Sequence, residues 1–236
     1  MWWIEFKTDI SGPLAFVWPA NQSRNARELI LPDQRTTILS PEVCRASNTS
    51  AEAHPFLLVI VCSSVPNFEA RYSIRESWAQ EAEALKKVKV IFLVGTEVNE
   101  THQEQIISES EQYGDIIQVK GVMRKHFFNQ FLQESFIDTY ANLTVKSLFL
   151  LKWFNSHCDK TQYVMKADDD MYINLDRLYA TVQANKRPNL LMGRLISNAI
   201  PIKDPYNKWY APQYMFAGKI YPNYLSGKTV VIEIDP

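Results

Sequence analysis

The sequence predicts an α/β protein built on a mostly parallel sheet flanked by helices. Short apolar runs rich in β-branched residues alternate with longer segments of helical composition, which is typical of repeated βαβ units. The runs at residues 56–62 and 88–94 are apolar almost throughout, as expected for strands buried on both faces of a parallel sheet. Apolar residues make up 46% of the 236 residues, which suffices for one substantial domain or two small ones.

The elements follow in order from the N-terminus. Residues 1–53 mix Pro, Asn, Ser and Arg with weak periodicity, so we expect an irregular stem or arm, with one short ordered piece at 28–31. We expect the folded domain to span residues 54–236. Its first strand, 56–62, is followed by a turn and then by a helix from 68 to about 86, which places Arg71, Arg75 and Trp78 on one face.

The same alternation continues through the rest of the chain. The predicted elements are a strand at 88–94, a polar helix at about 100–113, a short strand at 115–118, a helix at 143–155, a strand at 162–167, a helix at 175–184 and a strand at 190–193. Ligands of parallel sheets bind beyond the carboxyl ends of the strands, and Asp168, Asp169 and Asp170 (the Asp triplet) follow such an end.

The Asp triplet is the strongest chemical signal in the sequence. Adjacent carboxylates raise one another's pKa unless a cation or hydrogen bonds compensate their charge, and a hard divalent ion with oxygen ligands is the usual compensation. In an extended chain the first and third side chains share one side. We therefore expect Asp168 and Asp170 to face a metal-bound diphosphate, with Asp169 behind them on the donor side. The alternative is a solvated acidic turn that caps the helix beginning near Asn174.

Several function classes are disfavoured. The net charge of −1 gives no basic face for nucleic acid. No apolar run reaches the roughly 18 residues of a membrane helix. Four N-glycosylation sequons, at Asn21, Asn48, Asn99 and Asn142, mildly favour the secretory pathway, although Asn142 also suits a helix N-cap.

Three cysteines add a second clue to the compartment. Cys62 lies within the first predicted strand and is expected to be a buried thiol. Cys44 and Cys158 remain as candidates for a disulfide, which a lumenal setting would permit, but the sequence does not show that they meet.

Seven segments, taken in order, resemble the β1,3-galactosyltransferase family, which also holds β1,3-N-acetylglucosaminyltransferases. Residues 71–78 (RYSIRESW) resemble its R-x-x-I-R-x-T-W block, with Ser77 in place of Thr. The others lie at 92–95 (FLVG), 113–117 (YGDII), 136–146 (FIDTYANLTVK), 163–174 (the block of the Asp triplet), 208–210 (KWY) and 221–227 (YPNYLSG).

The resemblance implies a GT-A-type, Rossmann-like fold, a UDP-sugar donor, a glycan acceptor, Mn²⁺, inversion at the anomeric carbon and a type II Golgi membrane protein. Carried over to this sequence, it places Arg71, Arg75, Asp115 and Lys146 on the nucleotide side. Asp168 and Asp170 would hold the metal, with Asp169 also on the donor side. Trp209 and Tyr224 would lie towards the sugar or acceptor.

Each of these residues also has an ordinary structural interpretation. Arg71, Arg75 and Lys146 could be charges on helix surfaces, and Trp78, Trp153 and Trp209 could be core residues. The donor sugar is open as well: we predict transfer of galactose in β1,3 linkage, with N-acetylglucosamine transfer or a UDP-sugar-binding product without activity as alternatives.

Two departures from the family pattern are expected to matter. Residues 119–133 separate two blocks that adjoin in the family, and we interpret them as a retained intron or, alternatively, a surface loop insertion. An inverting transfer needs a carboxylate as general base. The family supplies it in an acidic element beyond the last matched block, so we expect base and N-terminal anchor to lie outside the printed sequence. Donor binding is then expected to survive without catalysis.

Overall fold

A computed structural model describes residues 36–39, 43–44, 54–96, 99–120, 143–158, 160–207 and 209–233. The chain divides into two compact units, which are described separately. The larger unit comprises residues 30–193 and 227–236, and the smaller one comprises 1–29 and 194–226. Strands β6 (Leu191–Ile196) and β7 (Tyr224–Glu233) have residues in both.

The described strands form one mixed, mostly parallel sheet in the order β1-β4-β3-β2-β5-β7-β6. Besides β6 and β7 they are β1 (Thr36–Leu39), β2 (Leu57–Cys62), β3 (Val88–Val94), β4 (Ile116–Lys120) and β5 (Tyr163–Asp168). Pairings β2–β3, β2–β5 and β3–β4 are parallel, while β1–β4 and β5–β7 are antiparallel. The predicted α/β class with a mostly parallel sheet is confirmed.

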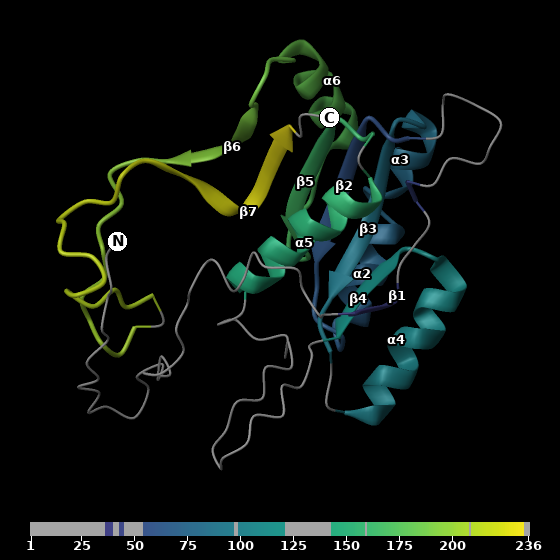
Figure 1. The fold of residues 1–236 in the computed structure, drawn as a ribbon, viewed down its shortest axis with the longest axis horizontal. Coiled ribbons are helices and arrows are strands. Elements are labelled where there is room, and N and C mark those ends of the chain that lie inside the picture. Colours follow the sequence, from purple (N-terminus) through teal and green to yellow (C-terminus); the bar gives the residue numbers. More distant parts are fainter. Residues whose placement is uncertain are drawn as a thin grey trace. The chain divides into compact units, whose positions relative to one another are not determined.

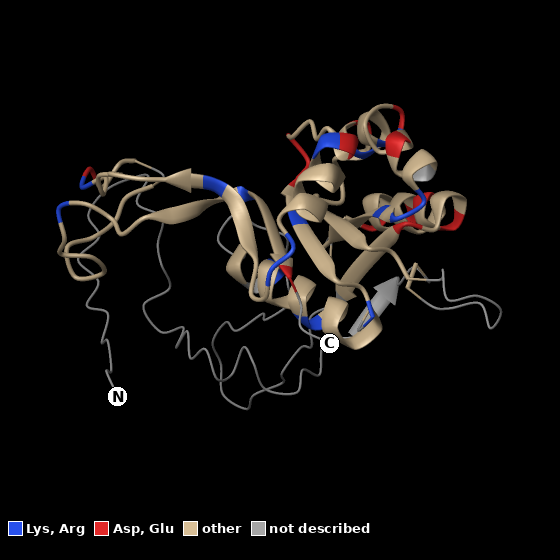
Figure 2. Ribbon diagram, turned by 90° about the horizontal axis from the view of Figure 1, so that it is seen from above, with Lys and Arg blue, Asp and Glu red and all other residues tan. Residues whose placement is uncertain are grey.

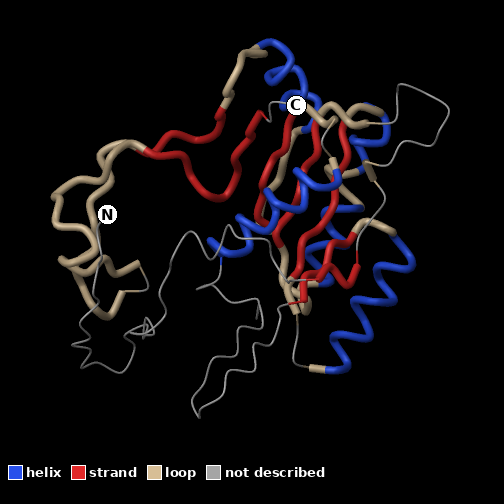
Figure 3. Tube along the Cα trace, in the orientation of Figure 1, coloured by secondary structure: helices blue, strands red, loops and turns tan. Residues whose placement is uncertain are grey.

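Helices pack on both faces of this sheet (Figures 1 and 3). They are α2 (Phe68–Arg75), α3 (Gln80–Leu85), α4 (Glu100–Tyr113), α5 (Leu143–His157) and α6 (Leu175–Ala184). Strand β2 is buried along its whole length, and its alternate residues enter two different cores because successive side chains point to opposite faces. The continuous apolar run of β2 thus reflects a strand covered on both sides.

Different helices close the two cores. Leu57, Val59 and Val61 pack in a core that also contains residues of α2, α4 and α6. Leu58 and Ile60 pack instead against Phe149, Leu150, Trp153 and Phe154 of α5, which crosses in front of the strands in Figure 1. Figure 2 shows Lys and Arg interspersed with Asp and Glu along the described chain.

The helix expected from 68 to about 86 is wrong as a single element. It is divided into α2 and α3 by turns at residues 76–79. The Ser77 hydroxyl donates back to the Ser73 carbonyl at 2.5 Å, the kind of local bond by which serine competes with helix geometry. Trp78 is only 2% exposed and lies in the core with Ile74. Burial of this indole therefore overrides the helical composition of the segment.

Strand β1 was not predicted, although it lies within the stretch expected to be an irregular arm. Its backbone pairs antiparallel with β4, where Thr37 is in register with Val119. Val119 and Lys120, the first two residues of the expected insertion, therefore lie in the sheet. Residues 121–133 of that segment fall outside the described residues.

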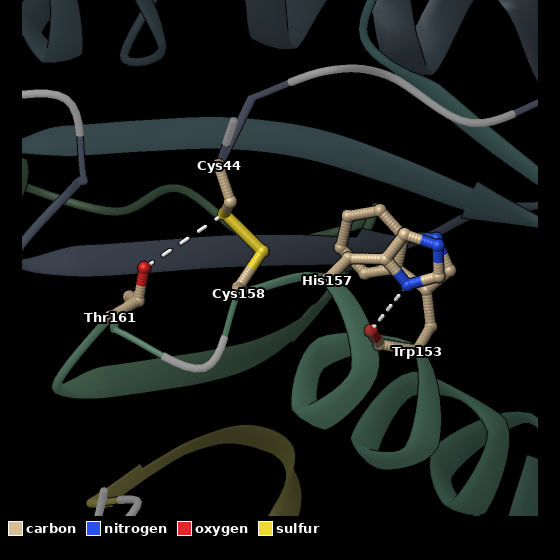
Figure 4. The surroundings of a disulfide bond; sticks show 5 residues. All are labelled: Cys44, Trp153, His157, Cys158 and Thr161. Carbon is tan, nitrogen blue, oxygen red and sulfur yellow. Dashed lines mark hydrogen bonds between the residues drawn. A yellow bond between two sulfur atoms is a disulfide. The ribbon is translucent and has the colours of Figure 1, made fainter. Parts of the chain in front are cut away.

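A disulfide joins Cys44 to Cys158, across a sequence separation of 114 residues (Figure 4). Cys158 follows α5, and both cysteines belong to the core on the α5 face. His157 stacks on Trp153 with ring centroids 4.8 Å apart. The sequence left these two cysteines as candidates without showing that they meet, and the structure joins them; Cys62 is a buried free thiol as predicted.

The described part of the smaller unit, residues 194–207 and 209–226, has little regular structure. Lys203 Nζ donates to the carbonyl oxygens of Ala211 and Phe216, which ties two parts of this segment together. Among the described residues, no helix combines the length and apolar character that crossing a bilayer requires.

Candidate donor-binding site

The Asp triplet lies where the order of the sheet changes direction. Strands β2, β3 and β4 follow one another to one side, and β5 then pairs with the opposite edge of β2. In register, Cys62 of β2 is opposite Asp168 of β5, so Ser63 and Asp169 come one step beyond the last pair. The carboxyl ends of two strands on either side of such a switch point form the usual ligand position of open α/β sheets.

The first and third carboxylates of the triplet are each paired with a lysine. Lys166 Nζ lies 2.5 Å from Asp168 Oδ1 and also donates to the Gly227 carbonyl at 2.7 Å. Lys228 Nζ lies 2.5 Å from Asp170 Oδ2. Both lysines come from the neighbouring strands β5 and β7, so Asp168 and Asp170 have cationic partners from the same part of the sheet.

The middle carboxylate has different partners. Asp169 Oδ2 accepts a hydrogen bond from Ser63 Oγ at 2.7 Å and another from Asn67 Nδ2 at 2.9 Å. Ser63 and Asn67 belong to the turn between β2 and α2. Immediately after the triplet, the Met171 carbonyl accepts from Trp78 Nε1 at 3.1 Å. The loop that carries the triplet is thus held by side chains from the turn after β2 and from the segment between α2 and α3.

The charge of the triplet is compensated by protein groups in this structure. The hydrogen bond to Asp170 is the main cause that raises the pKa of Lys228, against a smaller effect of burial, with help from the charges of Asp170 and Asp168. Two ammonium groups and two neutral hydrogen-bond donors therefore compensate the carboxylate charge, for which the sequence predicted a metal ion. Among the described residues, no three metal-ligating side chains converge.

The carboxylates nevertheless suit a hard divalent ion. Asp168 and Asp170 offer oxygen ligands, and their side chains are 32% and 60% exposed. Each accepts a hydrogen bond from one lysine ammonium, Lys166 or Lys228, through one carboxylate oxygen. Two protein carboxylates leave further positions for diphosphate oxygens, which is how such ions are bound with nucleotides.

Arg71 lies directly beneath this turn and is completely buried. Its Nε and Nη2 bind both carboxylate oxygens of Glu109 at 2.8 and 2.7 Å. Its remaining N–H groups donate to the hydroxyl of Ser63 and to the carbonyls of Ser64 and Val65. All five N–H donors of an arginine are then used within the protein. In this structure Arg71 holds the turn after β2 in place and does not present a donor at the surface.

Arg75 extends the same network by one turn of α2. It binds Asp115 through two bonds of 2.8 Å and Glu109 through a third of 2.8 Å. Its guanidinium stacks over the rings of Phe92 and Tyr113. Burial alone would raise the pKa of Glu109, but the hydrogen bonds and charges of the two arginines outweigh it and hold that pKa below its usual range.

This lowered pKa gives a pH dependence of stability. Because folded Glu109 binds a proton less readily than it does in the unfolded chain, its stabilising contribution is complete above the unfolded pKa of about 4.3 and is lost as the pH falls through the lower, folded value. We expect the urea midpoint to decline below about pH 4.3. Glu109→Gln should flatten this part of the profile, and an unchanged slope would contradict the assignment.

Lys146 of α5 reaches the same turn from the other face of the sheet. Its side chain is buried, and Nζ donates to the Ser63 carbonyl at 2.5 Å. The structure therefore brings Arg71, Lys146 and Asp169 together at Ser63, and Arg71 links Arg75 and Asp115 to them through Glu109. It does not present them as separate helix-surface charges.

Sequence reasoning missed five residues of this arrangement: Ser63, Asn67, Glu109, Lys166 and Lys228. A signal existed for Ser63 and Asn67, since polar residues after a buried parallel strand lie at its carboxyl end. Lys166, two residues before Asp168, shares its side of β5 by strand alternation. Nothing in the sequence indicated that Glu109 or Lys228 would meet residues so distant along the chain.

The two residues predicted to lie towards the sugar or acceptor are in the smaller unit, which is described by itself. Trp209 and Tyr224 belong to the smaller unit and are 57% and 45% exposed. Trp78 and Trp153 are core residues, as their structural interpretation predicted. Glu233 accepts a hydrogen bond from the Leu190 amide.

The sequons fall largely on residues whose structure is not described. Asn21, Asn48 and Asn142 lie outside the described residues. Asn99 is described: it is the N-cap of α4, and its side-chain oxygen accepts from the amides of Thr101 and His102. Asn99 is exposed, and its modification stays a prediction.

Comparison with known proteins places the same segments in one family. The family model described as Galactosyltransferase matches residues 69–122 and 121–235. Beta-1,3-galactosyltransferase 5 of Homo sapiens is 32% identical over 183 residues, which is 77% of this chain and 54% of that protein. Beta-1,3-galactosyltransferase 1 of Mus musculus is 32% identical over 186 residues, or 77% of this chain and 52% of that protein. The chain thus spans about half the length of these curated relatives.

Proposed function

Because this chain belongs to the galactosyltransferase family, we propose that it binds a UDP-sugar for transfer of galactose to a hydroxyl group of a glycan acceptor in β1,3 linkage. The observation that carries the proposal is the position of the Asp triplet at the switch point between β2 and β5, inside the segments that match the family. A nucleotide diphosphate and its cation are the ligand class that such a strand end suits.

In the proposed complex, Asp168 and Asp170 would hold Mn²⁺ and, through it, the donor diphosphate. The ion would supply charge neutralisation for the departing diphosphate. Lys166 and Lys228 each bond one oxygen of these carboxylates, and their ammonium groups would lie beside the anionic donor. Lys228 would be the more accessible of the two, because its side chain is 54% exposed against 16% for Lys166.

The remaining predicted donor residues would act through the turn after β2. Arg71 and Lys146 fix Ser63 from opposite sides of the sheet, and Arg75 with Asp115 holds Glu109 in place. These contacts make the edge of the site rigid before the donor arrives, which reduces the ordering cost of binding. The transfer itself forms a bond from the acceptor oxygen to the anomeric carbon, breaks the bond to UDP, and moves the hydroxyl proton to a carboxylate base.

Titration of UDP with and without Mn²⁺ tests the proposal. We expect Mn²⁺-dependent affinity for UDP, and we expect Asp168→Asn and Asp170→Asn each to lower that affinity by about 100-fold because several kcal/mol of charge stabilisation are lost. Asp176→Asn, an exposed carboxylate in the first turn of α6, is the matched control and should leave affinity unchanged. Equal UDP affinity with and without Mn²⁺ would overturn the metal assignment.

Transfer assays address the sugar and the activity. If the chain turns over a donor, release of UDP from UDP-galactose in the presence of a glycan acceptor, and not from UDP-N-acetylglucosamine, would support galactose as the transferred sugar. The reverse preference would favour N-acetylglucosamine transfer. Binding without turnover of either donor would identify a UDP-sugar-binding product.

We also propose a lumenal compartment of the secretory pathway, such as the Golgi. The disulfide between Cys44 and Cys158 supports it, since structural disulfides form and persist in oxidising environments. Galactosyltransferase family membership points the same way. Localisation of the tagged chain together with a Golgi marker is the direct measurement.

A further inference from the structure

We propose that Ser63 and Asn67 are positioning residues of the donor site, which act by fixing Asp169 and, through it, the turn that presents Asp168 and Asp170. This inference rests on the proposed function, because it concerns the same Asp triplet. It assigns a role to two residues that lie more than 100 positions before the triplet in the sequence.

The contact between Ser63 and Asp169 follows from strand register. Cys62 and Asp168 are the last in-register pair of β2 and β5, and the next residue of each strand meets its counterpart across the pair. Asp168 and Asp170 interact with lysines, whereas Asp169 interacts with the β2 side. The triplet is therefore held by the turn after β2 on one side, through Asp169, and by lysines of β5 and β7 on the other.

Ser63 is suited to this task because all of its polar groups are engaged. Its hydroxyl donates to Asp169 and accepts from Arg71 Nη1 at 3.1 Å. Its amide donates to the Leu93 carbonyl at 3.0 Å, and its own carbonyl accepts from Lys146. Ser63 is 2% exposed, and its hydroxyl has Asp169 as its near acceptor at 2.7 Å and the Ser64 carbonyl as a more distant one at 3.4 Å. Ser63 thus transmits the rigidity of the buried Arg71–Glu109 pair to Asp169.

Asn67 supplies the second bond to the same oxygen of Asp169, from an exposed position at the start of α2. It is the N-cap residue of that helix, yet its side chain makes no capping hydrogen bond. Asn is favoured at an N-cap for the bond it makes to the first turn of the helix. Here the side-chain amide of Asn67 donates to Asp169, and the first turn of α2 goes without a side-chain capping bond.

The test replaces Asn67 by a residue that suits the N-cap of α2 but cannot donate a hydrogen bond to Asp169. Asn67→Asp provides a good N-cap and an anion at the helix N-terminus, so the melting temperature should stay within about 2 °C of wild type. The same change sets a carboxylate against Asp169 and removes its donor. We expect the affinity for Mn²⁺ in the presence of UDP, measured from the electron paramagnetic resonance signal of free Mn²⁺, to fall about 10- to 100-fold.

Two further variants complete the experiment. Ser63→Ala should lower the Mn²⁺ affinity by a similar factor, since it removes the buried donor to Asp169. Asn99→Asp makes the same chemical change at the N-cap of α4 and is the matched control, with unchanged affinity expected.

Outcomes separate the two proposals. If the wild-type chain binds Mn²⁺ with UDP but Asn67→Asp and Ser63→Ala bind equally well, the positioning role is overturned and the proposed function stands. A loss of affinity in Asn67→Asp that is matched by a large fall in melting temperature would also overturn it, because general destabilisation then explains the loss. A wild-type chain without Mn²⁺-dependent UDP affinity would remove both proposals.

Discussion

Replacing both Cys44 and Cys158 by Ala is expected to lower the free energy of unfolding by about 4–5 kcal/mol. The bond closes a loop across 114 residues, and cross-links over long loops remove the most conformational entropy from the unfolded chain. It also fixes the segment around Cys44 to the end of α5, where both cysteines are buried in one core. Urea unfolding of oxidised protein and of the double variant measures the difference.

Reduction provides an internal control for this prediction. Dithiothreitol should destabilise the wild type and Cys62→Ala by similar amounts, because Cys62 is a free thiol. The double variant should not respond to the reductant. A double variant within about 1 kcal/mol of the oxidised wild type would show that the unfolded chain gains little freedom from loss of the cross-link.

Glu109→Ala is expected to destabilise the protein by about 3–5 kcal/mol, since it leaves a buried cation without its counter-charge. Glu109 binds Arg71 through both oxygens and Arg75 through one, and Arg71 is 0% exposed. The cost comes from the unpaired guanidinium and not only from the lost bonds. Chemical denaturation at neutral pH, where Glu109 is ionised, is the appropriate measurement.

Helix α4 itself supplies the matched control. Glu111→Ala changes an exposed carboxylate two residues away, and its effect should lie within about 0.5 kcal/mol of zero. An equally small effect for Glu109→Ala would mean that Arg71 finds another acceptor or admits water. The turn after β2 should then be rigid for a reason other than this ion pair.

Much of the fold was predictable because burial leaves a periodic record in the sequence. β2 and β3 read as continuous apolar runs, and α6 was predicted with its observed bounds because Asn174 caps a regular amphipathic segment. The single helix across α2 and α3 was wrong because local composition does not encode the burial of Trp78. Strand β1 was missed because a strand of four residues at the edge of a sheet carries too little pattern.

The candidate site divides in the same way. The sequence placed Asp168–Asp170 at a strand end, and order and register then set those residues beside Ser63. The sequence indicated that the negative charge of the three carboxylates must be compensated, but it did not identify Lys228 or Asn67 as their partners. Register between strands more than 100 residues apart depends on the whole core, and no local pattern specifies it.

By itself, the sequence determined the α/β class, the position of the carboxylate triplet on the chain and membership of the galactosyltransferase family. All three follow from the types and order of residues within short segments, because buried strands and chemical motifs each have a characteristic local sequence. Only the tertiary structure decided that Arg71 is a buried support and that Ser63 joins it to Asp169. Such roles depend on which distant groups satisfy each donor, because a buried polar group must find a partner wherever the fold provides one.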